Sequence, residues 1–343
     1  MNADKLVEVA RTLIADDKGL LAIDESNATC NKRFAKLDIP QTEEARRAYR
    51  ELIITTAGLG ESISGVILYD ETIRQRTKDG TLFVKVLADA GIVPGIKVDT
   101  GTIDLVGHPG EKITEGLDGL RGRLQEYHQM GARFAKWRAV IALGDGRPSS
   151  GCIEANAMAL ARYAALCQES GIVPIVEAEV KMNGEHSLER SRDATDAILW
   201  AVFVQLHSQK VILECLILKP NMVVAGLASA KQETVDEVAD ATLNCLMRIV
   251  PAAVAGIAFL SGGQSSELAS ARLNAMNIRS KAAGSRLPWP LAFSFARAIQ
   301  QPALEIWRGK EVNVSAAQRA LYRQASFNRL ARRGEFTDAL ESA

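Results

Sequence analysis

The chain has 343 residues, of which 47% are hydrophobic and 24% are charged, a composition typical of a globular protein with a large core. Lysine plus arginine and aspartate plus glutamate both number 41, so the formal net charge is zero. A general nucleic-acid binder usually shows a basic excess, so no nucleic-acid partner is expected. The best apolar run, Ile249–Leu260, contains a proline and a glycine and is too short to span a bilayer, so no membrane partner is expected either.

The N-terminal segment, residues 1–18, predicts an amphipathic helix with charges throughout and without the apolar region of a secretory signal. The chain has five cysteines, an odd number with no pair at C-x-x-C spacing. This pattern is typical of free, mostly buried thiols in a reducing compartment, so we expect a cytoplasmic protein. The cysteines are Cys30, Cys152, Cys167, Cys215 and Cys245.

One unit recurs along the rest of the chain, in which a short apolar run ends on a polar residue and a helical stretch follows. Apolar spacing at i, i+3 and i+4 predicts helices at 42–58, 152–171, 188–208 and 234–249. The runs are apolar throughout instead of alternating, which favours a parallel sheet buried on both faces. The eight runs are Gly19–Asp24, Ile63–Tyr69, Ile92–Val98, Ala132–Leu143, Ile172–Val180, Val211–Lys219, Gly256–Ser261 and Leu291–Phe295.

Eight strand–helix units predict an α/β fold of the (β/α)8 TIM-barrel type, as a single domain over residues 1–343 with a C-terminal helical segment at 300–343. The alternative is a doubly wound sheet. It is less favoured because Asp-Glu-Ser-Asn follows the first run, where a dinucleotide-binding sheet would carry G-x-G-x-x-G.

The polar residues at the strand ends are candidate site residues, because barrel active sites lie at the C-terminal ends of the strands. Any one of these charges could lie in solvent or form a structural ion pair. The whole set at one mouth instead indicates a site in which lysines and acids compensate each other, since burying an unpaired ion costs several kcal/mol. The set comprises Asp24, Glu177, Glu179, Lys97, Lys136, Lys219, Arg138 and Arg297.

Lys219 ends an apolar run, and apolar surroundings lower the pKa of a lysine. A neutral amine attacks a carbonyl to give a Schiff base, and the protonated imine allows a neighbouring carbon–carbon bond to break. We expect Glu177 to shuttle protons and Asp24 to accept the proton of the hydroxyl whose carbon becomes an aldehyde. Lys136 is expected to hold negative charge nearby and to help keep Lys219 neutral.

The ends of the seventh and eighth runs predict a phosphate site. Gly262 and Gly263 allow backbone N–H groups to approach an anion, and a helix pattern follows them. Barrels often bind phosphate between the loops after strands seven and eight. The residues expected here are Ser261, Gly262, Gly263, Ser294 and Arg297, and a second phosphate is expected across the mouth at Lys97, Arg33 and Arg138.

No metal site is expected, because the histidines are scattered without an H-x-x-x-H or similar pair and are more typical of surface or loop positions. They are His108, His128, His186 and His207.

Eight stretches stand in the order found in one known family: LLAIDES at 20–26, GIKVD at 95–99, EGLDGL at 115–120, FAKWR at 134–138, GIVPIVEAE at 171–179, LKPNMV at 218–223, FLSGGQS at 259–265 and FSFARA at 293–298. Across nearly its whole length the chain resembles the class I fructose-bisphosphate aldolases, the imine-forming kind of animals, plants and some bacteria. Any one match alone would be weak, whereas eight in order are specific.

The resemblance implies reversible cleavage of fructose 1,6-bisphosphate to dihydroxyacetone phosphate and glyceraldehyde 3-phosphate, in glycolysis and gluconeogenesis. It implies that Lys219 forms the imine, with Asp24, Lys136 and Glu177 as catalytic partners. It also implies a homotetramer that works without a cofactor. Glu179 is a further catalytic candidate, and Ser26 and Thr29 are further substrate-binding candidates.

The chain departs from the family pattern in places. Phe295-Ala296 stands where the family often has Tyr-Gly, although the backbone N–H of Ala296 is still available. Thr29 keeps a hydroxyl where the family commonly has Thr-Gly-Ser. The family's tyrosine-ending C-terminal arm is absent from the sequence, whose last tyrosine, Tyr322, lies in a helix pattern. We therefore expect proton exchange in dihydroxyacetone phosphate to differ from that of tailed members.

Other functions are weighed against this one. Another Schiff-base lyase, such as a transaldolase or a 2-keto-3-deoxy sugar acid aldolase, is less favoured because two phosphate sites are expected. A catalytically inactive barrel used for binding is less favoured because the set Asp24, Lys136, Glu177 and Lys219 is intact. The sequence does not separate fructose 1,6-bisphosphate from sedoheptulose 1,7-bisphosphate, the carbon-fixation substrate.

Overall fold

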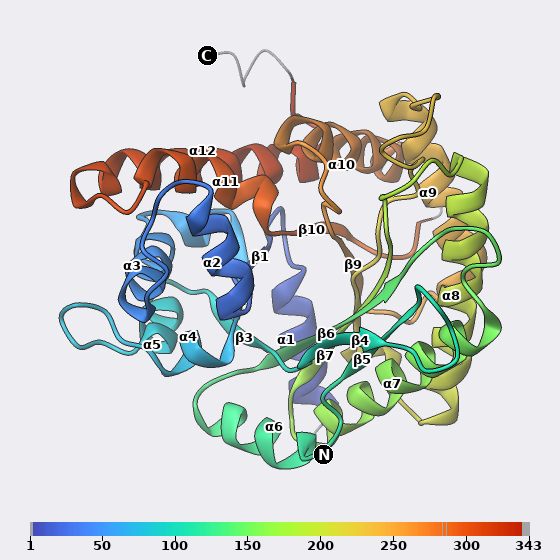
Figure 1. Ribbon diagram of the computed structural model, residues 1–343, viewed down its shortest axis with the longest axis horizontal. Helices are drawn as coiled ribbons and strands as arrows, with labels where there is room; N and C mark the ends of the chain where they lie inside the picture. Colours follow the sequence, from blue (N-terminus) through green and yellow to red (C-terminus); the bar gives the residue numbers. More distant parts are fainter. Residues whose placement is uncertain (1–2, 283, 286, 338–343) are drawn as a thin grey trace.

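Eight parallel strands form a closed barrel in the computed structural model, which describes residues 3–282, 284–285 and 287–337 (Figure 1). Neighbouring strands follow the order β1-β10-β9-β8-β7-β6-β3-β2, and the predicted (β/α)8 barrel in a single domain is thereby confirmed. The barrel strands are β1 Gly19–Ala22, β2 Ile63–Leu68, β3 Val93–Lys97, β6 Phe134–Ile141, β7 Val173–Val180, β8 Ile217–Leu218, β9 Gly256–Phe259 and β10 Leu291–Phe295.

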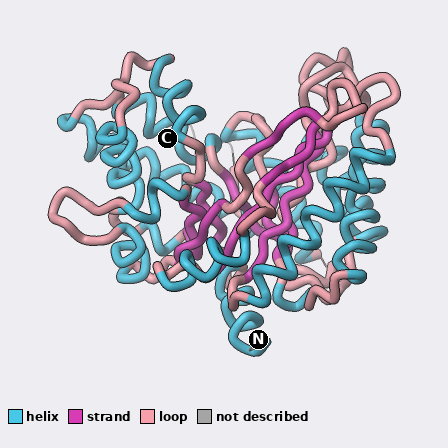
Figure 2. Tube along the Cα trace, turned by 60° about the horizontal axis from the view of Figure 1, so that its bottom comes forward, coloured by secondary structure: helices cyan, strands magenta, loops and turns pink. Residues whose placement is uncertain are grey.

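An outer ring of helices covers the barrel, as Figure 2 shows with helices in cyan around strands in magenta. The four predicted helices are confirmed, and Thr42 and Thr234 cap the starts of α3 and α9 with their side chains. The helices after α1 are α2 Asn27–Ala35, α3 Glu43–Ile54, α4 Asp70–Arg74, α5 Phe83–Asp89, α6 Leu120–Gln129, α7 Ser150–Glu169, α8 Leu188–Ser208, α9 Val235–Ile249, α10 Ser266–Lys281, α11 Arg297–Trp307 and α12 Val314–Arg333. Short 3-10 turns are η1 Leu59–Glu61, η2 Leu213–Cys215 and η3 Glu311–Asn313.

The barrel interior is filled by side chains of uneven size. The ring of Phe134 lies against Gly65 and Gly95 of the adjoining strands, and a Cβ at Gly95 would lie 2.3 Å from the Phe134 Cζ atom. Only glycine fits beside an aromatic ring at this distance, so the small residues of β2 and β3 make room for the large residue of β6. The interior is therefore a packed core and not a channel.

Helix α1, Ala3–Leu13, closes the N-terminal end of the barrel. Its apolar residues Leu6, Ala10 and Leu13 are buried and belong to the same core cluster as the inward-facing residues of the strands. Arg332 of α12 fixes the end of this segment by donating hydrogen bonds to the carbonyls of Ile14, Ala15 and Lys18. Of the predicted terminal segments, residues 1–2 and 338–343 lie outside the described residues.

Two features differ from the sequence-based expectation. The run Val211–Lys219 was predicted as one strand, but only Ile217–Leu218 pairs, because residues 213–215 form the 3-10 turn η2, which packs against α1 at the closed end. The sequence also gave no expectation of the antiparallel hairpin β4 Gly101–Asp104 and β5 Lys112–Glu115, which is inserted after β3. Among the helices of the described ranges, none has both the length and the apolar content to cross a membrane.

Candidate active site

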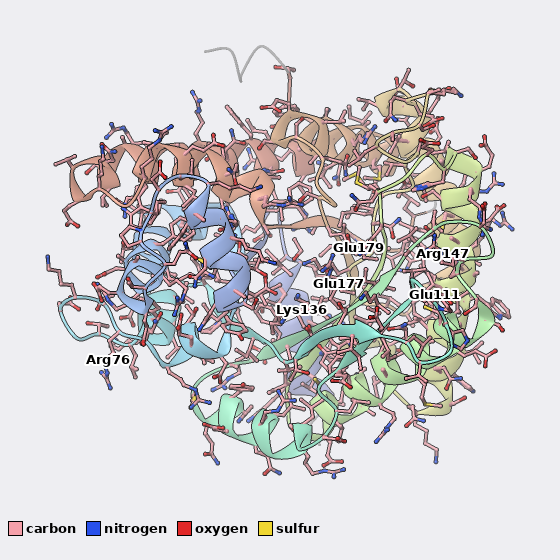
Figure 3. All side chains as sticks on the ribbon, in the orientation of Figure 1. Arg76, Glu111, Lys136, Arg147, Glu177 and Glu179 are labelled. Atoms are coloured by element: carbon pink, nitrogen blue, oxygen red, sulfur yellow. The ribbon has the colours of Figure 1, made fainter. Side chains whose placement is uncertain are left out.

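All of the predicted site residues line one cavity of about 500 Å³ at the C-terminal ends of the strands. Figure 3 shows Lys136, Glu177 and Glu179 near the centre of the barrel mouth, while Arg76 lies at the periphery. Lys136, Arg138, Glu177 and Glu179 come together because the parallel strands β6 and β7 are paired, with Arg138 opposite Glu177. The predicted convergence of strand-end charges is therefore present.

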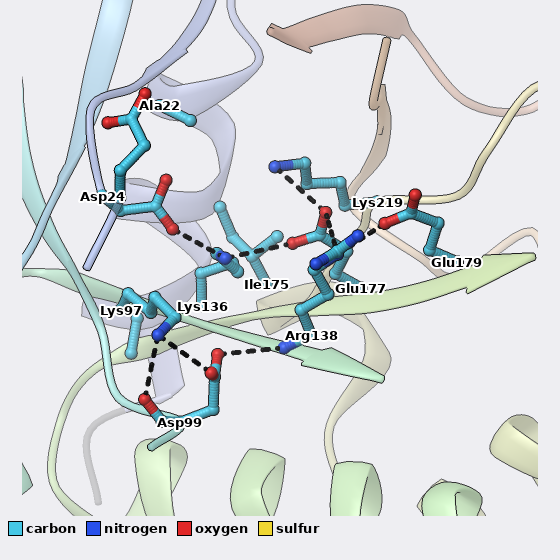
Figure 4. Close-up of polar contacts among 12 residues, drawn as sticks. Ala22, Asp24, Lys97, Asp99, Lys136, Arg138, Ile175, Glu177, Glu179 and Lys219 are labelled. Atoms are coloured by element: carbon cyan, nitrogen blue, oxygen red, sulfur yellow. Dashed lines mark hydrogen bonds and ion pairs between the residues drawn. The ribbon is translucent and has the colours of Figure 1, made fainter. Parts of the chain in front are cut away.

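Lys136 occupies the centre of the cavity floor, between two carboxylates (Figure 4). Its Nζ atom lies 2.7 Å from Asp24 Oδ2 and 3.3 Å from Glu177 Oε2. The exposed fractions of Lys136, Asp24 and Glu177 are only 4%, 8% and 3%. Ion pairs this deeply buried are strong only when each charge has a partner, and here each has one.

Lys219 stands at the end of β8, on the other side of the same carboxylate. Its Nζ atom lies 3.4 Å from Glu177 Oε1, so the two oxygens of Glu177 face one lysine each. The backbone N–H of Lys219 donates to Val176 O at 2.8 Å and extends the pairing of β8 with β7. This hydrogen bond fixes the position of a lysine that follows a strand of only two residues.

The surroundings shift the pKa values of the two central lysines in opposite directions. Burial lowers the pKa of Lys219, and the adjacent positive charge of Lys136 adds to this effect against the pull of Glu177 and Asp24. Burial alone would also lower the pKa of Lys136, but the carboxylates of Asp24 and Glu177 raise it above its usual value. Lys219 is therefore the lysine more readily deprotonated.

The carboxylates next to these lysines are held ionised. Burial disfavours the charged form of Asp24, but the charges of Lys136 and Lys219 outweigh it and lower the pKa to about 2. Burial likewise opposes ionisation of Glu177, and Lys136 and Lys219 again lower the pKa. Both groups are proton acceptors at neutral pH.

The cations expected at the second phosphate site are paired with acids. Lys97 Nζ lies 3.0 Å from Asp99 Oδ1, and Arg138 Nε lies 2.5 Å from Glu179 Oε2 (Figure 4). Asp99 also accepts a hydrogen bond from the backbone N–H of Arg138 at 3.3 Å. Glu179 contacts Arg138 and makes no ion pair with Lys219 or Lys136 among the described residues.

Helix α2 and the residues just before it supply another part of the cavity wall. Arg33 pairs with Glu25, whose second oxygen lies 3.1 Å from Arg50 Nη2, so one carboxylate serves two guanidinium groups. Ser26 caps α2 by accepting the backbone N–H of Thr29, and the two hydroxyls lie 3.1 Å apart. Sequence analysis missed several charged lining residues, although each is within three positions of a residue that was singled out. They are Glu25, Lys32, Lys36 and Asp99.

Two loops meet at the expected first phosphate site. Gly262 and Gly263 have positive φ angles of 60° and 96°, which favour glycine and turn their backbone toward the cavity. Helix α11 begins at Arg297 without a side-chain cap, so its first N–H groups remain available for an anion. The Oγ atom of Ser294 is buried without a hydrogen-bond partner, and the Arg297 side chain has no ion-pair partner among the described residues.

The acids, cysteines and histidines of the chain bear on the question of a metal site. Within the described ranges, no three or more histidine, cysteine, aspartate or glutamate side chains are grouped as a metal ion would need. All five cysteines are free and buried, as predicted.

Fold and cavity together define a (β/α)8-barrel enzyme with its active site at the carboxyl ends of the strands. A family model described as fructose-bisphosphate aldolase class-I matches residues 5–343. The chain belongs to this class I fructose-bisphosphate aldolase family.

Several named proteins are similar to this chain in sequence. A probable fructose-bisphosphate aldolase class 1 of Xanthomonas campestris is 53% identical over 337 residues, which are 98% of this chain and 99% of that protein. A cytosolic fructose-bisphosphate aldolase of Arabidopsis thaliana is 47% identical over 97% of this chain and 92% of its own length. A chloroplastic one from the same plant is 47% identical over 98% and 84%.

A solved structure has nearly the same fold. It is the Plasmodium falciparum fructose-bisphosphate aldolase in complex with TRAP and a small-molecule inhibitor. Its TM-score is 0.95 at 43% identity, covering 98% of this chain and 96% of that chain.

Proposed function

We propose that this protein is a lyase that reversibly cleaves fructose 1,6-bisphosphate to dihydroxyacetone phosphate and glyceraldehyde 3-phosphate through an imine on Lys219. The observation that carries this proposal is the carboxylate of Glu177 placed between two buried lysines, of which only Lys219 has a lowered pKa. The family relationship supports the substrate. The role is in glycolysis and gluconeogenesis.

Imine formation uses Lys219 and Glu177. The neutral Nζ of Lys219 attacks the substrate ketone carbon, and the proton lost by the nitrogen passes to Glu177, 3.4 Å away. Glu177 then passes this proton to the former ketone oxygen, which becomes a hydroxyl. A second proton, taken up from solvent through Glu177, lets that hydroxyl leave as water, and a positively charged imine remains on Lys219.

Bond cleavage uses Asp24. The hydroxyl on the carbon that becomes the aldehyde gives its proton to the ionised Asp24, and the electron pair of the breaking carbon–carbon bond flows into the imine to form an enamine. Lys136, 2.7 Å from Asp24, keeps that carboxylate ionised until the step begins. Protonation of the enamine and hydrolysis of the imine release dihydroxyacetone phosphate and restore Lys219.

The substrate phosphates occupy opposite walls of the cavity. The loop 261–263, Ser294 and the start of α11 with Arg297 hold one phosphate. Arg33, Lys97 and Arg138, with Ser26, Thr29 and Lys32, hold the other. Since Glu179 and Asp99 pair with Arg138 and Lys97, we propose that these acids orient the cations.

The test traps the imine. The protein is incubated with dihydroxyacetone phosphate and EDTA, reduced with borohydride, and digested for mass spectrometry, because hydride converts the imine to a stable amine. An adduct on Lys219 is expected. An adduct on Lys136 would reverse the two lysine roles, and a folded protein without an adduct would contradict the mechanism.

We propose a cytoplasmic homotetramer as the working form. Free cysteines suit a reducing compartment, although the named relatives include both cytosolic and chloroplastic proteins. Large apolar side chains exposed on the neighbouring helices α7, α8 and α9 support assembly, among them Trp200, which is 64% exposed. Sedimentation equilibrium tests the tetramer, and a monomeric mass would contradict it.

A further inference from the structure

A buried glutamine on α11 connects three elements around the cavity. The Nε2 group of Gln300 donates to the carbonyl of Ala22 at 2.5 Å, and its Oε1 atom accepts from Arg33 Nη1 and from the Tyr49 hydroxyl, both at 3.0 Å. A guanidinium only donates and a backbone carbonyl only accepts, so these partners fix the orientation of the amide. Gln300 therefore links β1, α2 and α3.

Gln300 occupies a position where an apolar residue would be expected. It is 0% exposed, and Ile299, Ala303 and Leu304 beside it on α11 are apolar and equally buried. A buried amide is costly unless its donors and acceptors are paired. Two of its three partners, Ala22 and Arg33, line the active-site cavity, which suggests a role beyond packing.

Arg33 is the partner that depends most on Gln300. Its other contacts among the described residues are the ion pair with Glu25, which Glu25 shares with Arg50, a 3.3 Å hydrogen bond to Gln301, and a position 6.0 Å from the centre of the Tyr49 ring. Without the amide oxygen of Gln300, the Nη1 atom of Arg33 keeps only the ion pair with Glu25, so the guanidinium is less firmly held and can shift about Glu25. Its placement in the cavity wall would then be lost.

The hydrogen bond from the amide nitrogen of Gln300 to Ala22 is expected to have a smaller effect on the site. Ala22 lies two residues before Asp24, but the chain between them is also held by the hydrogen bond from Ile23 N to Ile67 O at 3.0 Å. The Asp24 carboxylate has its own partner in Lys136. Loss of Gln300 should therefore disturb the position of Arg33 more than that of Asp24.

We infer that Gln300 is a positioning residue that makes the enzyme selective for substrates with two phosphates, because it holds Arg33 in place for the phosphate farther from the reacting ketone. The inference rests on the proposed function, in which Asp24 acts on the half of the substrate that becomes the aldehyde, and it places the phosphate of that half at Arg33, on helix α2 just after Asp24. Fructose 1-phosphate lacks this phosphate and should not sense the change. Gln300 thus changes the KM for fructose 1,6-bisphosphate relative to that for fructose 1-phosphate, and it does not change the chemical step.

The experiment compares both substrates in the wild type and Gln300→Met. The hydrogen bond lost is to a charged group, so KM for fructose 1,6-bisphosphate is expected to rise about tenfold. The kcat for it, and both constants for fructose 1-phosphate, should stay within about twofold. The matched control is Gln168→Met, since Gln168 is also buried but exchanges its 2.7 and 2.9 Å hydrogen bonds with the backbone of Ile212. The control should leave the substrate ratio unchanged.

Two further variants show whether Gln300 acts through Arg33. In an Arg33→Ala background, Gln300→Met should change KM for the bisphosphate no further, because the group it positions is gone. Tyr49→Phe removes one donor to Gln300 but keeps the ring, which stacks on Trp307 at 5.4 Å. It should shift KM in the same direction by about two- to threefold, and it replaces Gln300→Met if that variant does not fold.

Two results would overturn the inference: a ratio of the KM values for the two substrates that does not change, whether both rise equally or neither rises, or additive effects of the Arg33 and Gln300 substitutions. Failure of the proposed function has a different signature, because the wild type would then cleave neither substrate.

Discussion

At its N-terminal end the barrel is closed by the apolar side chains of α1, whereas at its C-terminal end the same strands carry buried lysines and carboxylates. The closed end gains free energy from area removed from water and has no need of exact charge pairing. The open end gains little stability, because the cost of burying ions offsets their attraction. The difference indicates that one end maintains the fold and the other holds charges for chemistry.

The largest effect is expected at the open end. Lys219→Met should lower the cleavage rate by about four orders of magnitude or more, because no other group in the proposed mechanism forms the imine. Its stability should stay equal or rise. The lowered pKa means that folding opposes protonation of Lys219, a cost present at neutral pH that a neutral side chain removes. Enzyme assays and thermal unfolding check both, with the exposed Lys310→Met as the control. A less stable but active variant would reverse the assignment.

The matching change at the closed end is Leu13→Ala. Leu13 is 0% exposed, so the cavity left behind should lower the free energy of unfolding by about 2–5 kcal/mol. The kcat and KM of the folded protein should be unchanged. Urea unfolding and steady-state kinetics measure the two quantities, with the exposed Glu8→Ala as a neutral control. A large change in KM would mean that the two ends are coupled.

The pH dependence of stability should separate the ends further. The folded-state pKa of Asp24 is about 2, below its ordinary value of 3.8, so its ionised form stabilises the fold above pH 4 and this contribution is lost as the pH falls toward 2. Asp24→Asn should therefore be less stable than the wild type at pH 7 by on the order of 2 kcal/mol. When unfolding is measured between pH 7 and 3, the difference in the free energy of unfolding between Asp24→Asn and the wild type should narrow. The corresponding difference for Leu13→Ala should stay constant. A constant gap for Asp24→Asn would contradict the charge pairing.

The smallest effect tests whether the outer ring around the open end is only structural. Thr234 and Glu237 form a capping box at the start of α9, outside the cavity lining. Thr234→Ala should lower the free energy of unfolding by about 1 kcal/mol. Kinetics should not change, and Thr234→Ser should restore stability. A loss of activity would extend the functional region into the ring.

Much of this organisation was predictable because it follows from periodicity. Continuous apolar runs place the strands, and the barrel topology brings their ends together, so Lys136 and Glu177 meet although 41 positions separate them. Prediction from the local sequence pattern failed where packing against a distant element determines the backbone conformation. The run Val211–Lys219 is largely apolar and resembles a strand, but three of its nine residues form the turn η2 in contact with α1.

The partners of individual side chains could not be predicted from the sequence either. Lys97 and Arg138 were predicted as anion binders, but nothing in their spacing indicates that Asp99 and Glu179 pair with them. Gln300 gave no signal at all, because one amide among the apolar residues of α11 resembles an ordinary helix position until its partners are known.

The Lys219–Glu177–Lys136–Asp24 row contains two cations and two anions when every group is charged (Figure 4). With Lys219 neutral before reaction, the row carries a net charge of minus one. The imine carries one positive charge on that nitrogen and brings the row back to electroneutrality. The deficit in the resting state thus favours the cationic intermediate over the free amine, so the site is electrostatically matched to the middle of the reaction and not to its beginning.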